Sequence, residues 1–258
     1  MDVQTYLHRI KYQGSIQPDY DTLRGLHIAH MRTVPFENLD VMLKRPIRID
    51  EESLWEKIVV NERGGFCYEL NGSFARLLTQ IGFEITYLNG RVFNKEGQLG
   101  IEFDHLALLV KIPDSSTHWL ADVGFGDSFT EPLEFENDGK QTQGLRAYRL
   151  EKVVDGFVMW QKNYDSTWGR KYFFDIGPRM FPQDYEAGCL YHQTSPNTSF
   201  TQGSVVSRAT DDGRVSLNDN WLTITKSGER VKRPLESQDE FQSLLKEHFG
   251  IVLQKEIA

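Results

Sequence analysis

The sequence predicts an α+β protein with three parts, because the spacing of its apolar residues changes along the chain. Up to residue 82, apolar residues recur at the 3.6-residue spacing of amphipathic helices. From residue 83 they follow the period of two that is typical of strands. Residues 191–258 mix strand-like runs with a terminal helix. We therefore expect a helical part over 1–82, a β part over 83–190 and a smaller α+β part over 191–258.

Three amphipathic helices are predicted in the helical part. The first occupies residues 20–34 and must end before Pro35, because the residue before a proline is disfavoured in the helical conformation. The second occupies about residues 50–62 and starts with an aspartate, which is a favourable N-cap. The third carries an apolar stripe over residues 66–81 and ends at Gly82.

The β part consists of short strands joined by turns, a pattern that predicts a barrel or a strongly curved sheet. Strands are expected at 83–88, 91–93, 105–112 and 118–123. The last two follow each other and should form an antiparallel hairpin, in which one strand starts beside the end of the other. An Asp-Gly pair at 155–156 predicts a further hairpin.

The remaining segments are predicted from local turn and cap signals. A turn around a proline is expected at 34–39, and a short helix at 183–190. Hairpin-like runs occupy 205–225. The capping-box spacing that begins at Ser237 starts a terminal helix, which stops at Gly250.

Composition and motifs exclude several classes of protein. The net charge of −8 argues against a general nucleic-acid binder, because contact with phosphates needs a basic surface. The N-terminus lacks the features of a signal peptide and no run is apolar enough to span a bilayer, so we expect a cytoplasmic protein without a membrane partner. Two cysteines are not a disulfide framework, and no zinc-binding motif is present, so no metal is expected.

The candidate nucleophile is Cys67, in the first turn of the third helix. Gly64 and Gly65 are expected to take the positive φ that lets one helix end and the next begin. The N-terminus of a helix favours a thiolate by only about 0.3–1 kcal/mol, so a basic partner is needed. The alternative is that Cys67 is a small buried apolar residue, as we expect Cys189 to be.

A cysteine nucleophile needs a histidine base and a third group that orients the histidine. His105 opens one strand of the predicted hairpin and Asp122 closes the other, so the hairpin would bring the two together. Spacing alone leaves His118 and Asp104 as alternatives. Two histidines of the first helix are expected at the surface, in hydrogen bonds rather than in catalysis: His27 and His30.

Four motifs, taken together and in order, are much more specific than any one of them. They are Val34-Pro35-Phe36-Glu37-Asn38-Leu39, Arg63-Gly64-Gly65-Phe66-Cys67-Tyr68-Glu69-Leu70-Asn71, Phe103-Asp104-His105-Leu106-Ala107-Leu108-Leu109-Val110 and Asp122-Val123-Gly124-Phe125-Gly126. The combination resembles the arylamine N-acetyltransferases, specifically the shorter, prokaryotic-type members. The resemblance covers essentially the whole chain and is strongest over residues 20–130.

The resemblance implies an N-terminal helical bundle, a central β-barrel and a C-terminal α/β lid, with a Cys-His-Asp core similar to that of papain-like proteases and transglutaminases. The matching positions make Cys67 the nucleophile, His105 the base and Asp122 the orienting group. Three further residues are implied to brace the cysteine turn through buried polar contacts: Arg63, Glu37 and Asn71. Lys44-Arg45, where the family often has glycine, affects only a surface turn.

The resemblance also implies the residues around the substrates. Four residues match positions that wall the pocket of the acceptor amine: Phe36, Val92, Phe125 and Phe200. Gly124 and Gly126 match a glycine loop near coenzyme A. Residues 205–233 hold a slight excess of basic residues that could face the phosphates of coenzyme A, although a solvated charged face is the simpler interpretation.

The implied activity is acetyl-CoA-dependent N-acetylation of arylamines, arylhydrazines and related aromatic amines, as in xenobiotic metabolism. It would follow a ping-pong mechanism through an acetyl-cysteine, with acetyl-CoA as co-substrate and no metal. One alternative is a transglutaminase-like or peptidase-like thiol hydrolase that uses the same three residues. The other is a binding module on a degenerate scaffold, although none of Cys67, His105 and Asp122 is missing.

Overall fold

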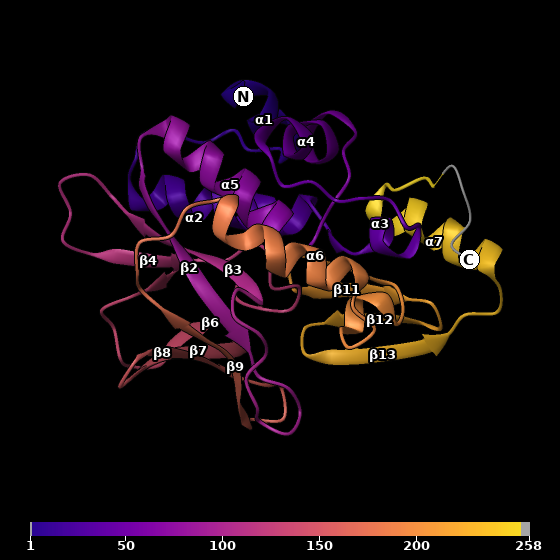
Figure 1. Cartoon of the computed structure of the whole chain (residues 1–258). Coiled ribbons are helices and arrows are strands. Elements are labelled where there is room, and N and C mark those ends of the chain that lie inside the picture. Colours follow the sequence, from indigo (N-terminus) through magenta and orange to yellow (C-terminus); the bar gives the residue numbers. More distant parts are fainter. Residues whose placement is uncertain (1, 254–258) are drawn as a thin grey trace.

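The computed structural model describes residues 2–253, and Figure 1 shows how their helices and strands are arranged. The N-terminal helices lie above an eight-stranded sheet, at the lower left of the view, and a five-stranded sheet, at the lower right. The helix α6 (Glu186–Thr194) runs in front of the region between them. This mixture of helices and antiparallel sheets confirms the predicted α+β class. The boundaries proposed at residues 82 and 190 stay predictions.

The helical part contains the three predicted helices and two short ones that the sequence did not predict. Asp19 and Asp50 cap two of the helices, because their side chains accept hydrogen bonds from backbone N–H groups three residues further on. The short helices have too few turns to show a hydrophobic period. The elements are α1 (Val3–Arg9), α2 (Tyr20–Thr33), α3 (Leu39–Met42), α4 (Glu51–Trp55), which continues into the π-helical η1 (Glu56–Val60), and α5 (Cys67–Ile81).

The helix α5 is the centre of the molecule. It is buried along nearly its whole length, and its apolar residues share one core with the inward-facing residues of β3. Gly82 ends it with a φ of 112°, a left-handed conformation that side chains other than glycine's disfavour. Because both the bundle and the sheet pack against α5, the position of Cys67 at its first turn is fixed from two sides.

The eight-stranded sheet is curved into a nearly closed barrel with the order β5-β4-β3-β2-β9-β8-β7-β6. The predicted hairpins are confirmed as β3–β4 and β7–β8. The runs predicted separately at 83–88 and 91–93 form one strand. The strands are β2 (Glu84–Val92), β3 (His105–Lys111), β4 (His118–Ala121), β5 (Leu133–Glu134), β6 (Gln141–Gln143), β7 (Arg146–Val153), β8 (Gly156–Lys162) and β9 (Trp168–Asp175).

Two glutamine side chains close the gap between the edge strands β5 and β6. The Gln141 amide donates to the backbone oxygen of Glu134 and accepts from its N–H, at 2.9 and 2.8 Å. The Gln143 amide accepts from the N–H groups of Thr130 and Glu131 and donates to the Glu131 oxygen at 2.7 Å. The side chains therefore replace the ladder of backbone hydrogen bonds at this seam.

The five-stranded sheet is antiparallel and is covered by α7. The side chains of Phe241, Leu244 and Leu245 pack with those of Val206 and Leu217 in a core of their own. The sheet has the order β1-β10-β11-β12-β13. Its elements, with the short helices before it, are β1 (Phe36–Glu37), η2 (Gln183–Tyr185), η3 (Ser199–Thr201), β10 (Val205–Ala209), β11 (Gly213–Asn218), β12 (Trp221–Lys226), β13 (Glu229–Pro234) and α7 (Gln238–Phe249).

The segment expected as a simple turn at 34–39 is part of this sheet. Its strand β1 pairs with β10, and Phe36 lies opposite Ser207. The prediction was wrong because the pairing partner lies far away in the sequence, where local signals do not reach. Phe36 is thereby placed between the helical part and the C-terminal residues.

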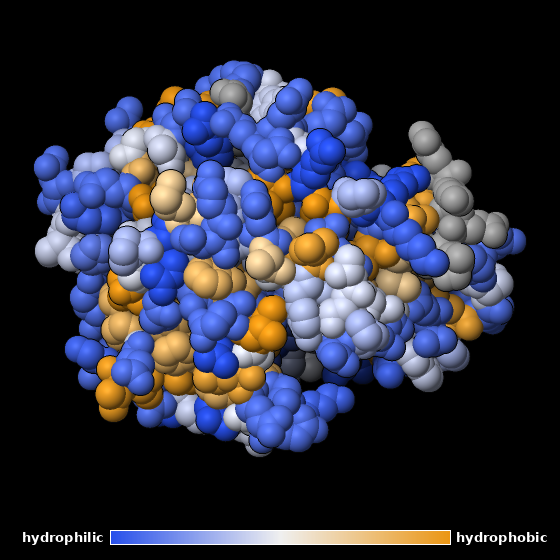
Figure 2. Space-filling view, viewed as in Figure 1, coloured by the Kyte–Doolittle hydropathy of each residue, from blue (hydrophilic) through white to orange (hydrophobic). Residues whose placement is uncertain are grey.

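The visible surface is mostly hydrophilic, as Figure 2 shows, and it is hollowed between the barrel and the five-stranded sheet. Within residues 2–253 no helix combines the length and the apolar character that crossing a bilayer requires.

Candidate active site

Close packing explains the two glycines before Cys67. A Cβ on Gly64 would lie 2.0 Å from the backbone oxygen of Pro35, and one on Gly65 would lie 2.6 Å from a carboxylate oxygen of Glu69. Neither glycine has a positive φ, so the conformational reason expected from the sequence was wrong. The backbone of Pro35, just before β1, and the side chain of Glu69 lie so close that this turn has no room for side chains.

A buried cluster of charges braces the same turn. The Glu37 carboxylate accepts from the Arg63 guanidinium at 2.7 Å, and Lys57 Nζ lies 2.7 Å from Asp40 and 2.6 Å from Glu69. Glu69 also accepts from the N–H of the residue that precedes Cys67, at 3.1 Å. Burial raises the pKa of Glu69 to about 7, although Lys57 opposes this shift. The first turn of α5 is therefore held by ionic contacts on its bundle side.

His105 and Asp122 meet as the hairpin predicts. His105 is the first residue of β3 and Asp122 directly follows β4, and His105 Nε2 lies 2.9 Å from Asp122 Oδ2. Both are buried, with exposed fractions of 3% and 0%. Burial alone would raise the pKa of Asp122, but His105 and Asn71 outweigh it and lower that pKa. The carboxylate therefore stays ionised beside the imidazole.

Cys67 completes this group. Its side chain is close enough to His105 to influence the pKa of the imidazole, and Asp122 engages His105 Nε2, so Nδ1 is the nitrogen left to face the thiol. Burial by itself would lower the pKa of His105, but Asp122 and then Cys67 outweigh it and raise this pKa to about 10. The imidazole is therefore protonated at neutral pH, which suits a thiolate partner.

The Asp122 carboxylate and its backbone are held by further hydrogen bonds. Asn71 Nδ2 donates to Oδ1 at 2.8 Å, and the N–H of Gly124 donates to the same oxygen at 3.0 Å. The backbone N–H of Asp122 donates to His27 Nε2 at 3.1 Å, while His27 Nδ1 donates to the Thr130 oxygen. Burial lowers the pKa of His27 to about 4, so it remains neutral in this role.

His27 corrects an expectation, since both it and His30 are fully buried rather than at the surface. The helical period places His27 on the inner face of α2, and this period was the signal that could have predicted its burial.

Tyr172 was also missed in the sequence analysis. Its buried ring lies 4.9 Å from the ring of His105, between centroids, and nothing in the period of β9 marks it as special.

The alternative histidine and carboxylate are engaged elsewhere. His118 Nδ1 lies 2.6 Å from Glu136 and is about one-third exposed. Asp104 lies 2.9 Å from His192 and accepts from the N–H of Val92. Neither lies in hydrogen-bond contact with Cys67 within residues 2–253.

Cys67 and His105 lie in the wall of a cavity of about 1330 Å³ between the barrel and the five-stranded sheet. Its aromatic wall includes Phe36 and Phe200, whose ring centroids are 6.0 Å apart. Phe125 meets the ring of His105 edge-on at 5.2 Å. The other predicted residues that line the cavity are Val92 and Gly124.

The two glycines of the predicted loop leave room at this wall. A Cβ on Gly124 would lie 2.7 Å from the Cα of Cys67. Gly126 has a φ of 86°, and a Cβ on it would lie 3.3 Å from Cδ1 of the Phe36 ring. Substitution at either position would therefore push against the nucleophile or the aromatic wall.

The basic residues that line the cavity differ from those suggested by the sequence. Arg91 and Lys95, from β2 and the segment that follows it, line the cavity. From 205–233, Arg214 lies 3.1 Å from Asp127, Arg233 binds Glu240, and neither lines the cavity. The described residues contain no cluster of three or more His, Cys, Asp or Glu side chains arranged to hold a metal.

Comparisons with known proteins cover nearly the whole chain. Residues 19–258 match a family described as N-acetyltransferase. The arylamine N-acetyltransferase of Escherichia coli (strain K12) is 35% identical over 249 residues, which are 95% of this chain and 87% of that protein.

Solved structures agree with this match. The Mycobacterium marinum arylamine N-acetyltransferase in complex with CoA has a TM-score of 0.90 at 34% identity, covering 97% of this chain and 93% of that one. An arylamine N-acetyltransferase from Bacillus cereus, described as having a Cys-His-Glu catalytic triad, has a TM-score of 0.89 at 26% identity. It covers 98% of this chain and 100% of that one.

Proposed function

Because the chain belongs to the arylamine N-acetyltransferase family, we propose that Cys67 is its nucleophile, His105 its base and Asp122 the group that orients the base. The enzyme is an acyltransferase that moves the acetyl group of acetyl-CoA to the nitrogen of arylamines. The observation that carries the assignment of residues is the buried hydrogen bond between Asp122 and His105 beside Cys67, with His105 and Cys67 at the wall of an aromatic cavity.

In the first half of the reaction, the Cys67 thiolate attacks the carbonyl carbon of acetyl-CoA. The carbon–sulfur bond to coenzyme A breaks, and the departing thiolate takes the proton that His105 carried. Acetyl-Cys67, free coenzyme A and a neutral His105 result. Asp122 keeps the imidazole in place throughout and stabilises its protonated form at the start.

In the second half, the amine nitrogen attacks the acetyl carbon. The amine gives a proton to neutral His105, and the bond to Cys67 Sγ breaks as the amide forms. The thiolate and the imidazolium are restored together, so no proton is left over. This ping-pong sequence is typical of the family, and positioned proton transfer of this kind contributes roughly 10²–10⁴-fold to the rate.

The wall of the cavity favours aromatic acceptors. Phe36, Phe125 and Phe200 present rings at different angles, which suits offset or edge-on contacts with a flat aryl group. We assign these residues and Val92 to the acceptor amine, including arylhydrazines. Gly124 and Gly126 are assigned to the approach of coenzyme A, because side chains there would fill the space beside Cys67.

The cellular role follows from this chemistry. A pocket walled by the rings of Phe36, Phe125 and Phe200 would accept many foreign aromatic amines, so we assign the enzyme to xenobiotic metabolism. We infer from the donor, acetyl-CoA, that the reaction takes place in the cytoplasm.

The test is to mix the protein with acetyl-CoA, without amine, and to measure the intact mass. One acetyl adduct is expected on the wild type and on Cys189→Ala, and none on Cys67→Ala. Cys189 is a matched control because it is also buried, and burial raises the pKa of its thiol, which disfavours the thiolate. Added arylamine should remove the adduct.

An adduct on Cys67→Ala would contradict the assignment of the nucleophile. The absence of any adduct on the wild type, combined with hydrolysis of peptide or glutaminyl substrates, would favour the thiol hydrolase instead.

A further inference from the structure

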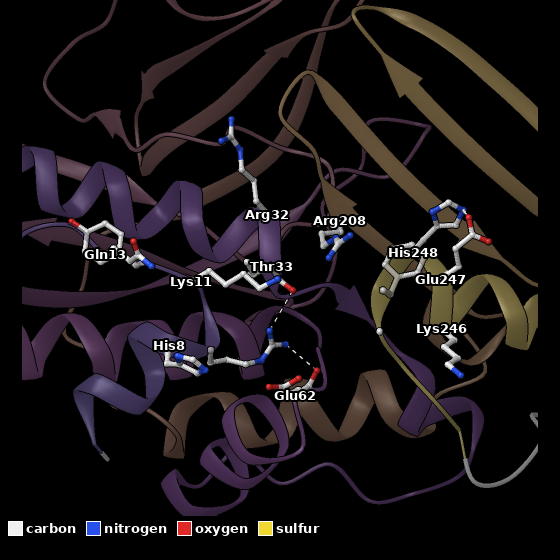
Figure 3. A pocket seen from close by; sticks show the side chains of 14 residues that line it. His8, Lys11, Gln13, Arg32, Thr33, Glu62, Arg208, Lys246, Glu247 and His248 are labelled. Carbon is white, nitrogen blue, oxygen red and sulfur yellow. Dashed lines mark hydrogen bonds and ion pairs between the residues drawn. The ribbon is translucent and has the colours of Figure 1, made fainter.

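A second cavity, of about 440 Å³, lies apart from the active site and shares no lining residue with it. Its walls come from the C-terminal ends of α1, α2 and α7 and from the strand β10. In Figure 3, Arg208 lies near the centre of the view, with Arg32 to one side and Glu247 and His248 to the other. The activity described above gives this cavity no role.

The cavity is basic although the protein is acidic. Five Lys or Arg side chains line it against two Glu, in a chain whose net charge is −8. The basic residues are Arg9, Lys11, Arg32, Arg208 and Lys246, and the acidic ones are Glu62 and Glu247. A positive cavity in such a protein needs a specific explanation.

Helix ends explain part of this charge. Arg9 and Lys246 lie in the last turns of α1 and α7, where cations are stabilised by the helix dipole. The Arg9 guanidinium also donates to the backbone oxygens of Ile58 and Glu62, at 2.8 and 2.9 Å. Arg32 lies 3.0 Å from Asp211, which is almost fully exposed. These basic residues would be expected without any ligand.

Arg208 has no such explanation. It lies on the strand β10 rather than in the last turn of a helix, and it makes no ion pair with another residue of 2–253. Its Nε is buried without a hydrogen-bond acceptor among those residues. Burial lowers the pKa of Arg208 and no carboxylate opposes the shift. Burial and, to a smaller extent, the charge of Arg208 lower the pKa of Arg9, while Glu62 raises it, so the two guanidiniums repel each other. An unpaired, partly buried charge of this kind is costly.

We propose that this cavity binds a phosphate dianion, with Arg208 as the central contact and Arg32 and Lys11 at its sides. A guanidinium forms paired hydrogen bonds with two oxygens of a phosphate, which would satisfy the buried Nε of Arg208. A dianion would also offset the excess of basic residues and relieve the repulsion between Arg208 and Arg9. The volume admits a phosphate together with a small organic group. The ligand class is therefore a phosphate monoester or a pyrophosphate.

The experiment measures thermal unfolding and calorimetric binding with inorganic pyrophosphate, against sodium chloride of equal ionic strength. Wild type should be stabilised by pyrophosphate, since a ligand that binds only the folded state raises its stability. Arg208→Gln should weaken binding by at least about tenfold, the loss expected for a charge-assisted contact. Arg48→Gln is the matched control, because Arg48 is an exposed arginine outside both cavities, and it should bind like wild type.

The melting temperature of Arg208→Gln in phosphate-free buffer gives a second test. Removal of an arginine whose role is to bind a ligand should leave this temperature unchanged or raise it, whereas removal of an arginine that stabilises the fold would lower it. Lys11→Gln, at an exposed residue, gives a second variant and should weaken binding about threefold.

Two outcomes would overturn the proposal. One is the absence of pyrophosphate binding to the wild type. The other is equal binding by Arg208→Gln and Lys11→Gln, together with competition by acetyl-CoA, which would place the anion in the active site.

Discussion

At the scale of single residues, the orientation of His105 depends on how firmly Asp122 is held. Asn71 and Gly124 fix one oxygen of the Asp122 carboxylate, which leaves the other oxygen for His105. His27 fixes the backbone of the same residue. A carboxylate whose two oxygens are both held has one orientation, so the imidazole has one as well. The charge of Asp122 is also the largest of the effects that raise the pKa of His105.

Asp122→Asn keeps the size of the side chain and removes this charge. The pKa of His105 should fall, and acetylation of Cys67 by acetyl-CoA should slow by roughly 10²–10⁴-fold. Stopped-flow measurement of coenzyme A release in a single turnover, over a range of pH, checks both. Asp138→Asn, at an exposed aspartate, is the control. A rate within threefold of wild type for Asp122→Asn would exclude Asp122 from the mechanism.

The same ion pair makes stability depend on pH. The pKa of His105 is about 10 in the folded protein and near 6.5 when unfolded. The protonated His105 therefore stabilises the folded protein fully below pH 6.5, and this stabilisation is lost as pH rises through 10. It is on the order of a few kcal/mol. Urea unfolding of Cys67→Ala, in which no thiol titrates beside the imidazole, should show a falling free energy between pH 6.5 and 9.5. In Cys67→Ala combined with His105→Gln this fall should be much smaller, and equal slopes would contradict the ion pair.

At the scale of elements, the barrel seam depends on side chains rather than on strand pairing. Gln143 makes three hydrogen bonds to backbone groups near β5. Gln143→Met has a similar length but leaves these groups without partners, so unfolding should become easier by about 2–3 kcal/mol. Gln17→Met, at an exposed glutamine, should have little effect. Denaturant unfolding measures both, and similar values for the two variants would mean that the seam contributes nothing.

The seam also shows which elements the sequence could reveal. The helices α2 and α5 and the hairpin β3–β4 were predictable, because their apolar periods and turn residues are local signals. The strands β5 and β6 are too short to show a period. The strand β1 pairs with β10, about 170 residues further on, so its two residues look like part of a turn.

The residues of the candidate site likewise differ in whether the sequence could identify them. The spacing of residues placed His105 and Asp122 at one end of a hairpin but could not separate them from His118 and Asp104. Only the combined motifs did so. The buried His27 resembles any other histidine of an amphipathic helix, because the hydrogen bond that gives it a role comes from a residue 95 positions away.

At the scale of the whole molecule, one buried asparagine connects the helical part to the C-terminal wall of the active site. Asn38 follows β1 and is 1% exposed. Its Nδ2 donates to the backbone oxygens of Phe200 and Gly203, both at 2.8 Å, and its Oδ1 accepts from the N–H of Val205 at 2.7 Å. The segment that carries Phe200 is therefore held on the residue next to β1, which itself carries Phe36. The two sides of the aromatic wall are thus positioned relative to each other by Asn38.

Asn38→Ala should separate the two halves of the reaction. Loss of the three hydrogen bonds frees the segment around Phe200, so the KM for an arylamine should rise at least about tenfold. Cys67 is held independently by α5 and the charge cluster, so its acetylation rate should stay within about threefold of the wild-type rate. Separate measurement of coenzyme A release and of steady-state amine acetylation gives the two values, and Asn61→Ala, at an exposed asparagine, is the control. If both halves slow equally, the asparagine supports the fold as a whole rather than the acceptor wall. If neither changes, Phe200 is positioned without it.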